Sequence, residues 1–301
     1  MITAQDRVYR WRAMASPISL HLPDLDDVLG HAVAQAVAAD MEATEQALSR
    51  FRETAELVAL NARVGQWTTV SDRLYKALSA ARQARLRTGG LFDPRVLGRL
   101  EAYGYQGAPR LAPEPRALQG PWLLRRPRTR EVLLLAPVDL GGIGKGLALR
   151  WAASIAEHVT GNLLLNAGGD LLAAGPGLEG EGWQIGVEDP QAPDSLKAAL
   201  RVSTRQAVCT SSVANLRWIH QGEEVHHLID PRSGRPGGEG LLAVTVVGRD
   251  PAWSEVLSKT LFLHGSGAIA RAASGHAALW VGQGGEFRLT DEAKDFVFWL
   301  P

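Results

Sequence analysis

Apolar and polar residues follow each other along the chain in patterns that predict both strands and helices. Residues 16–22 alternate between the two kinds, which is typical of a strand with one buried face. Apolar residues then recur at helical spacing, so we expect a helix that begins at Asp26 or Asp27 and ends near Leu48. The residues expected on its buried face are Val28, Ala32, Val33, Ala36, Val37 and Met41.

Two further helices have clear boundary signals. Ser71 is a suitable N-cap for a helix over residues 71–88, which Gly89 and Gly90 then end. Its expected buried residues are Leu74, Leu78 and Ala81. A third helix follows Gly146, and its expected buried face is formed by Leu147, Trp151, Ala152, Ile155 and Val159.

Short apolar runs in the second half of the chain predict strands. The expected strands cover residues 162–166, 171–174, 183–187, 200–203 and 241–247. We also expect a hairpin formed by residues 216–220 and 225–229, and a last helix from Asp250 or Pro251 to about His264. Residues 106–130 contain five prolines and six arginines and indicate an irregular, exposed connection. Because helices and strands mix without a regular βαβ rhythm, the predicted fold class is α+β.

Composition narrows the classes of protein that fit these elements. Of the 301 residues, 46% are hydrophobic and 21% charged, which is typical of a globular chain. Lys plus Arg and Asp plus Glu number 32 each, so no net charge attracts nucleic acid or an anionic membrane. No apolar run approaches the roughly 20 residues of a membrane span. One cysteine, Cys209, excludes an internal disulfide framework and a cysteine-based metal cage.

The first residues bear on the expected compartment. Residues 1–13 mix Asp, Arg, Tyr and Trp and contain no apolar stretch of signal-peptide length. If Met1 is the native start, we therefore expect a cytoplasmic protein.

Three glycine-rich segments are candidates for binding a ligand through the backbone. Residues 138–146 (VDLGGIGKG) combine four glycines with Asp139 and Lys145 just before a predicted helix, whose N-terminus favours phosphate. Residues 88–94 (TGGLFDP) and 166–170 (NAGGD) repeat the pairing of two glycines with a nearby carboxylate. Each of these two is more often a turn when it occurs alone, but three such loops could line one cleft.

Two other pairs of residues are candidates for chemistry. His226 and His227 are neighbours on a predicted strand and should point to opposite faces, so we expect one to face a site and the other to pack or be solvated. Glu255 and Lys259 are four residues apart on the last predicted helix and share a face. Their spacing alone favours a surface ion pair.

These segments, taken together and in order, resemble the ApbE family of FAD:protein FMN transferases. The resemblance is carried by residues 14–22, 48–61, 88–94, 138–146, 165–175, 183–190, 207–211, 225–236 and 244–265. The GGD, HHLIDP and DLGGIGKG elements are specific in combination.

The resemblance implies a fold and an activity. The implied fold is α+β and T-fold-like: one domain over residues 1–301, with two interleaved lobes of sheet and packed helices around a central FAD cleft. The implied reaction is the magnesium-dependent transfer of FMN from FAD to a Ser or Thr hydroxyl of a partner flavoprotein. FAD is then the bound substrate, and magnesium is the implied metal.

The resemblance also implies roles for particular residues. Contacts with FAD are expected from Met14, Phe51, Leu91, Phe92, Asp93, Asp139, Lys145 and Ile229. His227 would lie near the reacting phosphate, and a histidine or a carboxylate such as Glu255 could act as the base for the incoming hydroxyl. Gly142, through its carbonyl, and Glu255 would be magnesium ligands, and Lys259 stands at a further ligand position.

This chain departs from the family pattern at that last position. Relatives have Asp and Thr four residues apart on the last helix, where this chain has Glu255 and Lys259. An ammonium about 4 Å from a divalent ion would cost roughly 8 kcal/mol at an effective dielectric near 20. Either Lys259 turns away, or its ammonium occupies the place of the metal and pairs with Glu255 and a phosphate.

Two alternative functions follow from this departure. The chain could bind FAD without metal-dependent transfer, or it could hydrolyse the FAD pyrophosphate to FMN and AMP with water as the acceptor. An acceptor peptide that gains the mass of FMN distinguishes transfer from both.

Overall fold

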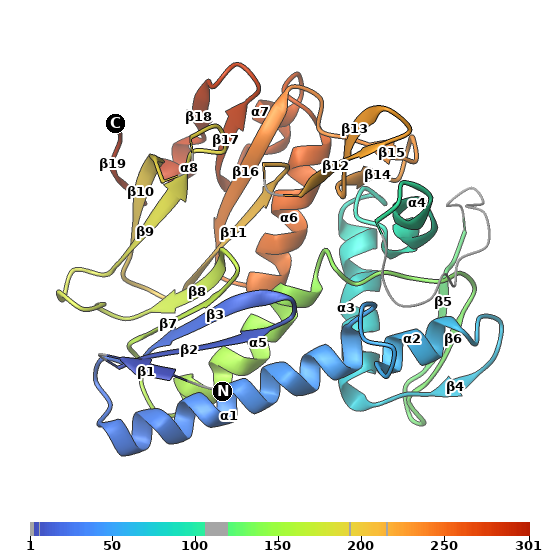
Figure 1. The fold of residues 1–301 in the computed structure, drawn as a ribbon, viewed down its shortest axis with the longest axis horizontal. Helices are drawn as coiled ribbons and strands as arrows, with labels where there is room; N and C mark the ends of the chain where they lie inside the picture. Colours follow the sequence, from blue (N-terminus) through green and yellow to red (C-terminus); the bar gives the residue numbers. More distant parts are fainter. Residues whose placement is uncertain (1–2, 6, 106–119, 193, 215) are drawn as a thin grey trace. The chain divides into compact units, whose positions relative to one another are not determined.

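The computed structural model describes residues 3–5, 7–105, 120–192, 194–214 and 216–301 (Figure 1). The chain forms two compact units that interleave along the sequence. Unit 1 comprises Met1–Glu42, Lys145–Asn215 and Gly238–Pro301, and unit 2 comprises Ala43–Gly144 and Leu216–Gly237. Both units contain helices and antiparallel strands, which confirms the α+β class.

Unit 1 is built on a nine-stranded sheet in the order β1-β2-β3-β7-β8-β11-β16-β17-β18. Its strands are β1 (Thr3–Gln5), β2 (Val8–Ala13), β3 (Ser16–His21), β7 (Leu163–Ala167), β8 (Asp170–Ala174), β11 (Gln206–Ser212), β16 (Leu241–Gly248), β17 (Ala277–Gly282) and β18 (Phe287–Leu289). A three-stranded sheet in the order β19-β10-β9 belongs to the same unit. It consists of β9 (Trp183–Glu188), β10 (Leu196–Val202) and β19 (Val297–Trp299).

The large sheet of unit 1 is buried on both faces because its strands alternate between two cores. On β7, Leu163 and Leu165 join a core that includes residues of α1 (Asp27–Leu48) and α5 (Gly144–Glu157). Leu164, on the opposite face, joins a second core with residues of β9 and β10. Helix α6 (Pro251–Leu263) packs along β11 and β16, as Figure 1 shows. The short helices α7 (Ile269–Ala272) and α8 (Asp291–Lys294) complete the unit.

Unit 2 consists of short elements. Its helices are α2 (Glu56–Asn61), α3 (Asp72–Arg87), the 3-10 helix η1 (Pro94–Val96) and α4 (Leu97–Ala102). A three-stranded sheet in the order β4-β6-β5 contains β4 (Thr68–Thr69), β5 (Leu123–Arg126) and β6 (Glu131–Leu134). The later part of the chain adds two hairpins, formed by β12 (Arg217–His220) with β13 (Glu223–His226) and by β14 (Ile229–Asp230) with β15 (Arg235–Pro236). No helix among the described residues has the length and apolar content that a membrane span requires.

Several predicted elements are confirmed. Strand β3, helices α1 and α3, and the strands β7, β8, β9 and β16 lie where the patterns indicate, and α6 is the helix predicted from Asp250 or Pro251. Capping residues are confirmed as well. Asp26 accepts a hydrogen bond from the backbone N–H of Leu29 at 2.8 Å, and Ser71 accepts one from Leu74 at 3.1 Å.

The predicted buried faces of two helices are partly wrong. On α1, Val28 is 83% exposed and Ala32 and Ala36 are also exposed, because the buried face follows Val33, Ala34, Val37 and Met41 instead. Val159, predicted on the helix after Gly146, lies beyond the end of α5 and is exposed. Alanine is apolar enough to fit either face, so tertiary packing decides which alanines are buried.

Three predicted boundaries also require correction. Within the predicted irregular segment 106–130, β5 pairs with β6, and residues 106–119 lie outside the described part of the chain. The second hairpin strand ends at His226, and Ile229 belongs to a different pair. The helix predicted to be last is followed by α7 and α8, which are too short to give a periodic signal.

Candidate functional site

The residues predicted for the site fall in both units. Unit 2 contains Phe51, Leu91, Phe92, Asp93, Asp139, Gly142, His227 and Ile229. Unit 1 contains Met14, Lys145, Glu255 and Lys259. Within each unit, contacts connect most of these residues.

In unit 2, the beginning of the glycine-rich segment is held by its neighbours. The side-chain amide of Asn61 donates to the carbonyl of Val138 at 2.8 Å and accepts from its N–H at 2.9 Å. The N–H of Asp139 donates to the carbonyl of Pro94 at 2.7 Å. The segment that carries Asp139 therefore lies beside the one that carries Asp93.

The carboxylate of Asp139 forms a buried ion pair with Arg50. Arg50 Nε lies 2.5 Å from Asp139 Oδ2, and the two side chains are 4% and 8% exposed. Asp139 Oδ1 also accepts a hydrogen bond from the N–H of Gly141. Because protein donors engage both oxygens, the role of Asp139 seen here is to hold Arg50 and the glycine-rich turn in place.

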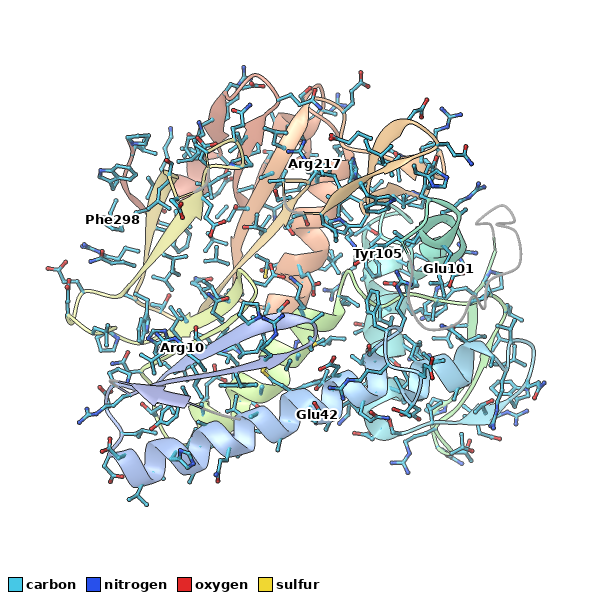
Figure 2. The ribbon with its side chains drawn as sticks, viewed as in Figure 1. Arg10, Glu42, Glu101, Tyr105, Arg217 and Phe298 are labelled. Carbon is cyan, nitrogen blue, oxygen red and sulfur yellow. The ribbon has the colours of Figure 1, made fainter. Side chains whose placement is uncertain are left out.

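Besides Asp139, Arg50 contacts an aromatic cluster. We define this cluster as Phe51, Tyr105, Trp218 and His227. Tyr105, labelled in Figure 2, is at its centre: its ring centroid lies 5.8 Å from that of Phe51, 5.4 Å from that of Trp218 and 6.2 Å from that of His227. The rings of Tyr105 and Trp218 are stacked at 19°. The guanidinium carbon of Arg50 lies 4.4 Å from the Phe51 centroid and 4.7 Å from that of Tyr105.

The aromatic cluster is suited to contact a flat heteroaromatic ring. Phe51 is 49% exposed, and its ring lies beside the Arg50 guanidinium. A ring next to a cation can stack further rings or carry cation–π contacts. The indole N–H of Trp218 donates to the carbonyl of Tyr103 at 2.7 Å, which ties the β12–β13 hairpin to the segment after α4.

The two adjacent histidines have different surroundings. His226 ends β13, and its Nδ1 accepts a hydrogen bond from the N–H of Leu228 at 3.2 Å. Burial lowers the pKa of His226 below its ordinary value. His227 contacts the Tyr105 ring and so belongs to the aromatic cluster. His227 is therefore the better candidate for chemistry on a ligand held by that cluster.

Asp93 is engaged by two arginines. Its Oδ2 lies 2.8 Å from Arg85 Nε and 2.7 Å from Arg95 Nη2, and its Oδ1 accepts from the backbone N–H of Arg95 at 3.0 Å. Burial raises the pKa of Asp93, but the hydrogen bonds from Arg95 and Arg85 outweigh it, so the pKa is lowered overall. The carboxylate caps η1 and anchors the loop that carries the predicted FAD contacts.

The remaining predicted residues of unit 2 are buried. Leu91, Phe92 and Ile229 belong to the core of the unit, and Gly142 lies buried in the turn before α5. The N–H of Phe92 donates to Thr88 Oγ1 at 3.0 Å. These side chains therefore shape the binding loops rather than present apolar surface.

In unit 1, Lys145 forms an ion pair with Asp170. The ammonium is bound to Asp170 Oδ2, while Oδ1 accepts from the backbone N–H of Thr210 at 3.0 Å. Burial lowers the pKa of Lys145, but the charges of Asp170 and Glu255 raise it by more, so that it lies above the ordinary lysine value. The lysine at the start of α5 is therefore a permanent cation.

The start of α5 approaches α6 closely, and a glycine makes this possible. A Cβ placed on Gly146 would lie 2.5 Å from the Cα of Ala252 and 2.5 Å from the carbonyl oxygen of Pro251. The N–H of Gly146 donates to Glu255 Oε2 at 2.7 Å. Gly146 thus allows α5, which carries Lys145, to contact α6, which carries Glu255.

Glu255 is buried and has a strongly shifted pKa. Burial is the main cause and Asp170 the next, and together they raise the pKa of Glu255 to about 7. Lys145, the Gly146 N–H and Lys259 all favour the ionised form, in that order. An acid with this pKa can exchange a proton near neutral pH, which suits a general acid or base.

The side chains around Glu255 do not provide the oxygen ligands of the magnesium site that the resemblance implies. Magnesium requires an octahedral set of oxygen ligands. Here Asp170 binds the Lys145 ammonium and Glu255 accepts from the Gly146 N–H. Lys259, one helical turn after Glu255, adds a second cation. Among the described residues, no three His, Cys, Asp or Glu side chains gather as a metal-binding group.

Met14 lies in the turn between β2 and β3. Met14 and Ala15 have φ of +52° and +57°, as two-residue hairpin turns require, although such values are uncommon for residues other than glycine. The N–H of Gly168 donates to the carbonyl of Pro17 at 3.0 Å, so this hairpin adjoins the turn that leads to Asp170. Met14 thus lies near the segment that holds Lys145.

These contacts also involve residues that were not predicted for the site, among them Arg50, Tyr105, Trp218 and Asp170. Asp170 ends the NAGGD segment, so the paired glycines already marked its position. Arg50 precedes a predicted FAD contact. Tyr105 and Trp218 are 113 residues apart and belong to no motif, so only the fold brings them together.

Comparisons with known proteins identify relatives that cover most of this chain. The FAD:protein FMN transferase of Treponema pallidum is 28% identical over 282 residues, covering 83% of this chain and 77% of that protein. The FAD:protein FMN transferase of Klebsiella pneumoniae is 27% identical over 275 residues, covering 86% and 83%.

Solved structures have the same fold. The ApbE protein of Thermotoga maritima has a TM-score of 0.83 at 26% identity, over 98% of this chain and 99% of that one. The flavin transferase ApbE of Vibrio cholerae has a TM-score of 0.79 at 19% identity, over 96% and 98%. The ApbE family model matches residues 14–280, and the chain therefore belongs to the ApbE family.

Proposed function

We propose that this protein transfers FMN from FAD to a Ser or Thr hydroxyl of a partner flavoprotein. The relatives that match most of the chain are named FAD:protein FMN transferases. Within the structure, the observation that carries the proposal is the position of Lys145, whose ammonium lies at the N-terminal end of α5 and pairs with Asp170. A permanent ammonium at a helix N-terminus is suited to a pyrophosphate.

The reaction requires one bond to form and one to break. The acceptor oxygen attacks the phosphorus of the FMN half, the bond from that phosphorus to the bridging oxygen breaks, and AMP leaves. The hydroxyl proton passes to a base, and the negative charge that develops on the leaving phosphate must be stabilised. We assign the base to His227 or Glu255, and the stabilising charge to Lys145.

In this proposal the flavin ring binds to the aromatic cluster of unit 2. The exposed Phe51 ring and the Arg50 guanidinium offer a stacking surface for a flat ring. The resemblance also implies magnesium dependence. The carboxylates around Glu255 do not fit magnesium, because they already bind groups of the protein. Magnesium therefore takes part in no step above.

A mass-spectrometric assay tests the proposal. The purified protein is incubated with FAD and a peptide that contains one Ser or Thr, with and without magnesium, and peptide mass and nucleotide products are measured. We expect the peptide to gain the mass of FMN while an equal amount of AMP appears. A peptide with Ala in place of the hydroxyl residue is the control and should stay unmodified.

Two other outcomes would contradict transfer. Free FMN and AMP with an unmodified peptide would identify a pyrophosphatase. Bound but intact FAD would identify a binding protein. Lys259 is the reason to test for these two alternatives, because it occupies a position that the resemblance implies is a metal ligand.

A further inference from the structure

Glu255 and Lys259 carry the inference. They are one turn apart on α6, so their side chains leave the same face of the helix. Glu255 is buried, Lys259 is partly buried, and the Lys259 charge favours the ionised form of Glu255. The two side chains therefore leave α6 on one face, and we take them as members of one site.

Three of the four carboxylate oxygens of Asp170 and Glu255 have an ammonium or N–H partner. Asp170 Oδ2 binds the Lys145 ammonium, and Asp170 Oδ1 accepts from Thr210 N–H at 3.0 Å. Glu255 Oε2 accepts from Gly146 N–H at 2.7 Å. Each of these oxygens uses a lone pair on a donor of the protein, so a divalent ion would have to compete with the protein's own contacts.

Charge arithmetic shows what Lys259 changes. With Lys145 and Lys259 protonated and both carboxylates ionised, the four side chains carry no net charge. Without Lys259 the remaining three carry one negative charge, which repels a pyrophosphate unless another cation enters. A lysine at this position is a cation that the chain itself provides.

We propose that Lys259 supplies the positive charge that this site needs, so that the protein binds FAD without a divalent cation. The inference rests on the proposed function, because FAD is the ligand that function requires. It predicts that residue 259 determines whether FAD binding requires a divalent cation. Wild type should not require one, and a variant without the lysine should.

FAD titrations of the full-length protein test this. Binding is followed by flavin fluorescence or calorimetry, in buffer with EDTA and in buffer with magnesium. We expect the wild-type dissociation constant to agree within about twofold between the buffers, and Lys259→Thr to bind about tenfold or more weakly in EDTA. Lys259→Arg keeps the charge and should stay close to wild type in EDTA.

A matched control separates charge at the site from the general loss of a lysine. Lys197 is also partly buried in unit 1 and pairs with Asp189 at 3.0 Å, so Lys197→Thr removes an ion pair elsewhere. We expect it to bind FAD like wild type in EDTA. Thermal unfolding of each variant shows that it is folded.

The results that overturn the inference are distinct from those that overturn the proposed function. Wild-type binding that weakens about tenfold in EDTA, or Lys259→Thr that binds like wild type in EDTA, overturns the inference alone. A wild-type protein that binds no FAD in either buffer overturns both.

Discussion

The backbone N–H of Gly146 donates a 2.7 Å hydrogen bond to Glu255 Oε2, although 109 positions separate the two residues in the sequence. The bond lies where α5 begins against α6, and a Cβ on Gly146 would overlap the backbone of Ala252. One contact therefore fixes the residue after Lys145 against the buried acid. The packing of two helices and the chemistry of the candidate site depend on the same glycine.

Replacing this glycine should destabilise the protein. In Gly146→Ala, the new methyl group meets backbone atoms at 2.5 Å, and backbone cannot rotate away as a flexible side chain can. Helices α5 and α6 must separate, at a cost of about 1–3 kcal/mol or more, and the bond to Glu255 lengthens. Urea unfolding measures the loss.

Gly161→Ala is the control for the substitution itself. A Cβ on Gly161 would meet no atom within 4 Å, and its φ is not positive. We expect its free energy of unfolding to lie within about 0.5 kcal/mol of wild type. Equal stability of the two variants would contradict the close approach of α5 and α6.

Glu255 should make stability depend on pH. An acid with a pKa of about 7 when folded and about 4.5 when unfolded favours the folded state below about pH 4.5. That contribution is lost as the pH rises through about 7. Glu255→Gln keeps an oxygen for the Gly146 N–H but cannot ionise. The difference in unfolding free energy between wild type and variant should therefore change by about 3 kcal/mol between pH 4 and 8, in favour of the variant at high pH.

Glu157→Gln provides the comparison. Glu157 forms a more exposed ion pair with Arg205, with side chains 26% and 40% exposed. An exposed ion pair is worth at most about 1 kcal/mol, so the difference in unfolding free energy between Glu157→Gln and wild type should stay below that at every pH measured. A Glu255→Gln curve parallel to that of wild type would mean that Glu255 titrates like an ordinary carboxyl.

Local signals in the sequence predict the local part of this fold. Ser71 and Asp26 cap helices as expected, because a capping side chain needs only its own backbone two or three residues on. The alternation of residues 16–22 specifies β3. The predicted face of α1 failed at Ala32 and Ala36, since alanine is compatible with either environment and distant strands determine which side is covered.

The candidate site could be predicted where glycine motifs mark it. Lys145 and Asp139 belong to such a motif, and each forms an ion pair within the protein, with Asp170 and Arg50 respectively. Tyr105 and Trp218 could not be found this way, because a stacked pair formed by residues from separate parts of unit 2 leaves no periodic signal. The ion pair between Arg85 and Asp93 could not be predicted either, since Arg85 belongs to another element.

Asp93 is predicted to be structural as well as functional. Asp93→Asn leaves Arg95, whose side chain is 4% exposed, without its compensating charge, and should destabilise the protein by about 3–5 kcal/mol. Asp72→Asn is the control, because Asp72 pairs with Lys76 at an exposed position and its loss should destabilise the protein far less. Chemical unfolding at neutral pH measures both. Similar costs for the two would contradict the buried role of Asp93.

Phe51 should contribute to FAD binding more than to stability. Its side chain is half-exposed, so Phe51→Ala should cost about 1 kcal/mol of stability or less, yet weaken FAD binding about tenfold through lost stacking. Phe298, labelled in Figure 2, is a matched control: it is 42% exposed and has Arg201 4.7 Å from its ring, much as Phe51 has Arg50. Phe298→Ala should bind FAD normally. Equal effects of the two substitutions on binding would exclude the aromatic cluster as the ring site.

His227 is one of the two candidate bases, and its test separates chemistry from binding. The imidazole lies 6.2 Å from the Tyr105 ring, centroid to centroid, within the aromatic cluster that is proposed to bind the flavin ring. His227→Asn should lower the rate of FMN transfer by about 10²–10⁴-fold while FAD affinity changes by less than about threefold. His220→Asn is the control, since His220 packs at 5.8 Å against another tyrosine, Tyr103, and should transfer normally. If His227→Asn loses affinity and rate in equal proportion, the histidine holds the ligand and the proton must pass to Glu255 instead.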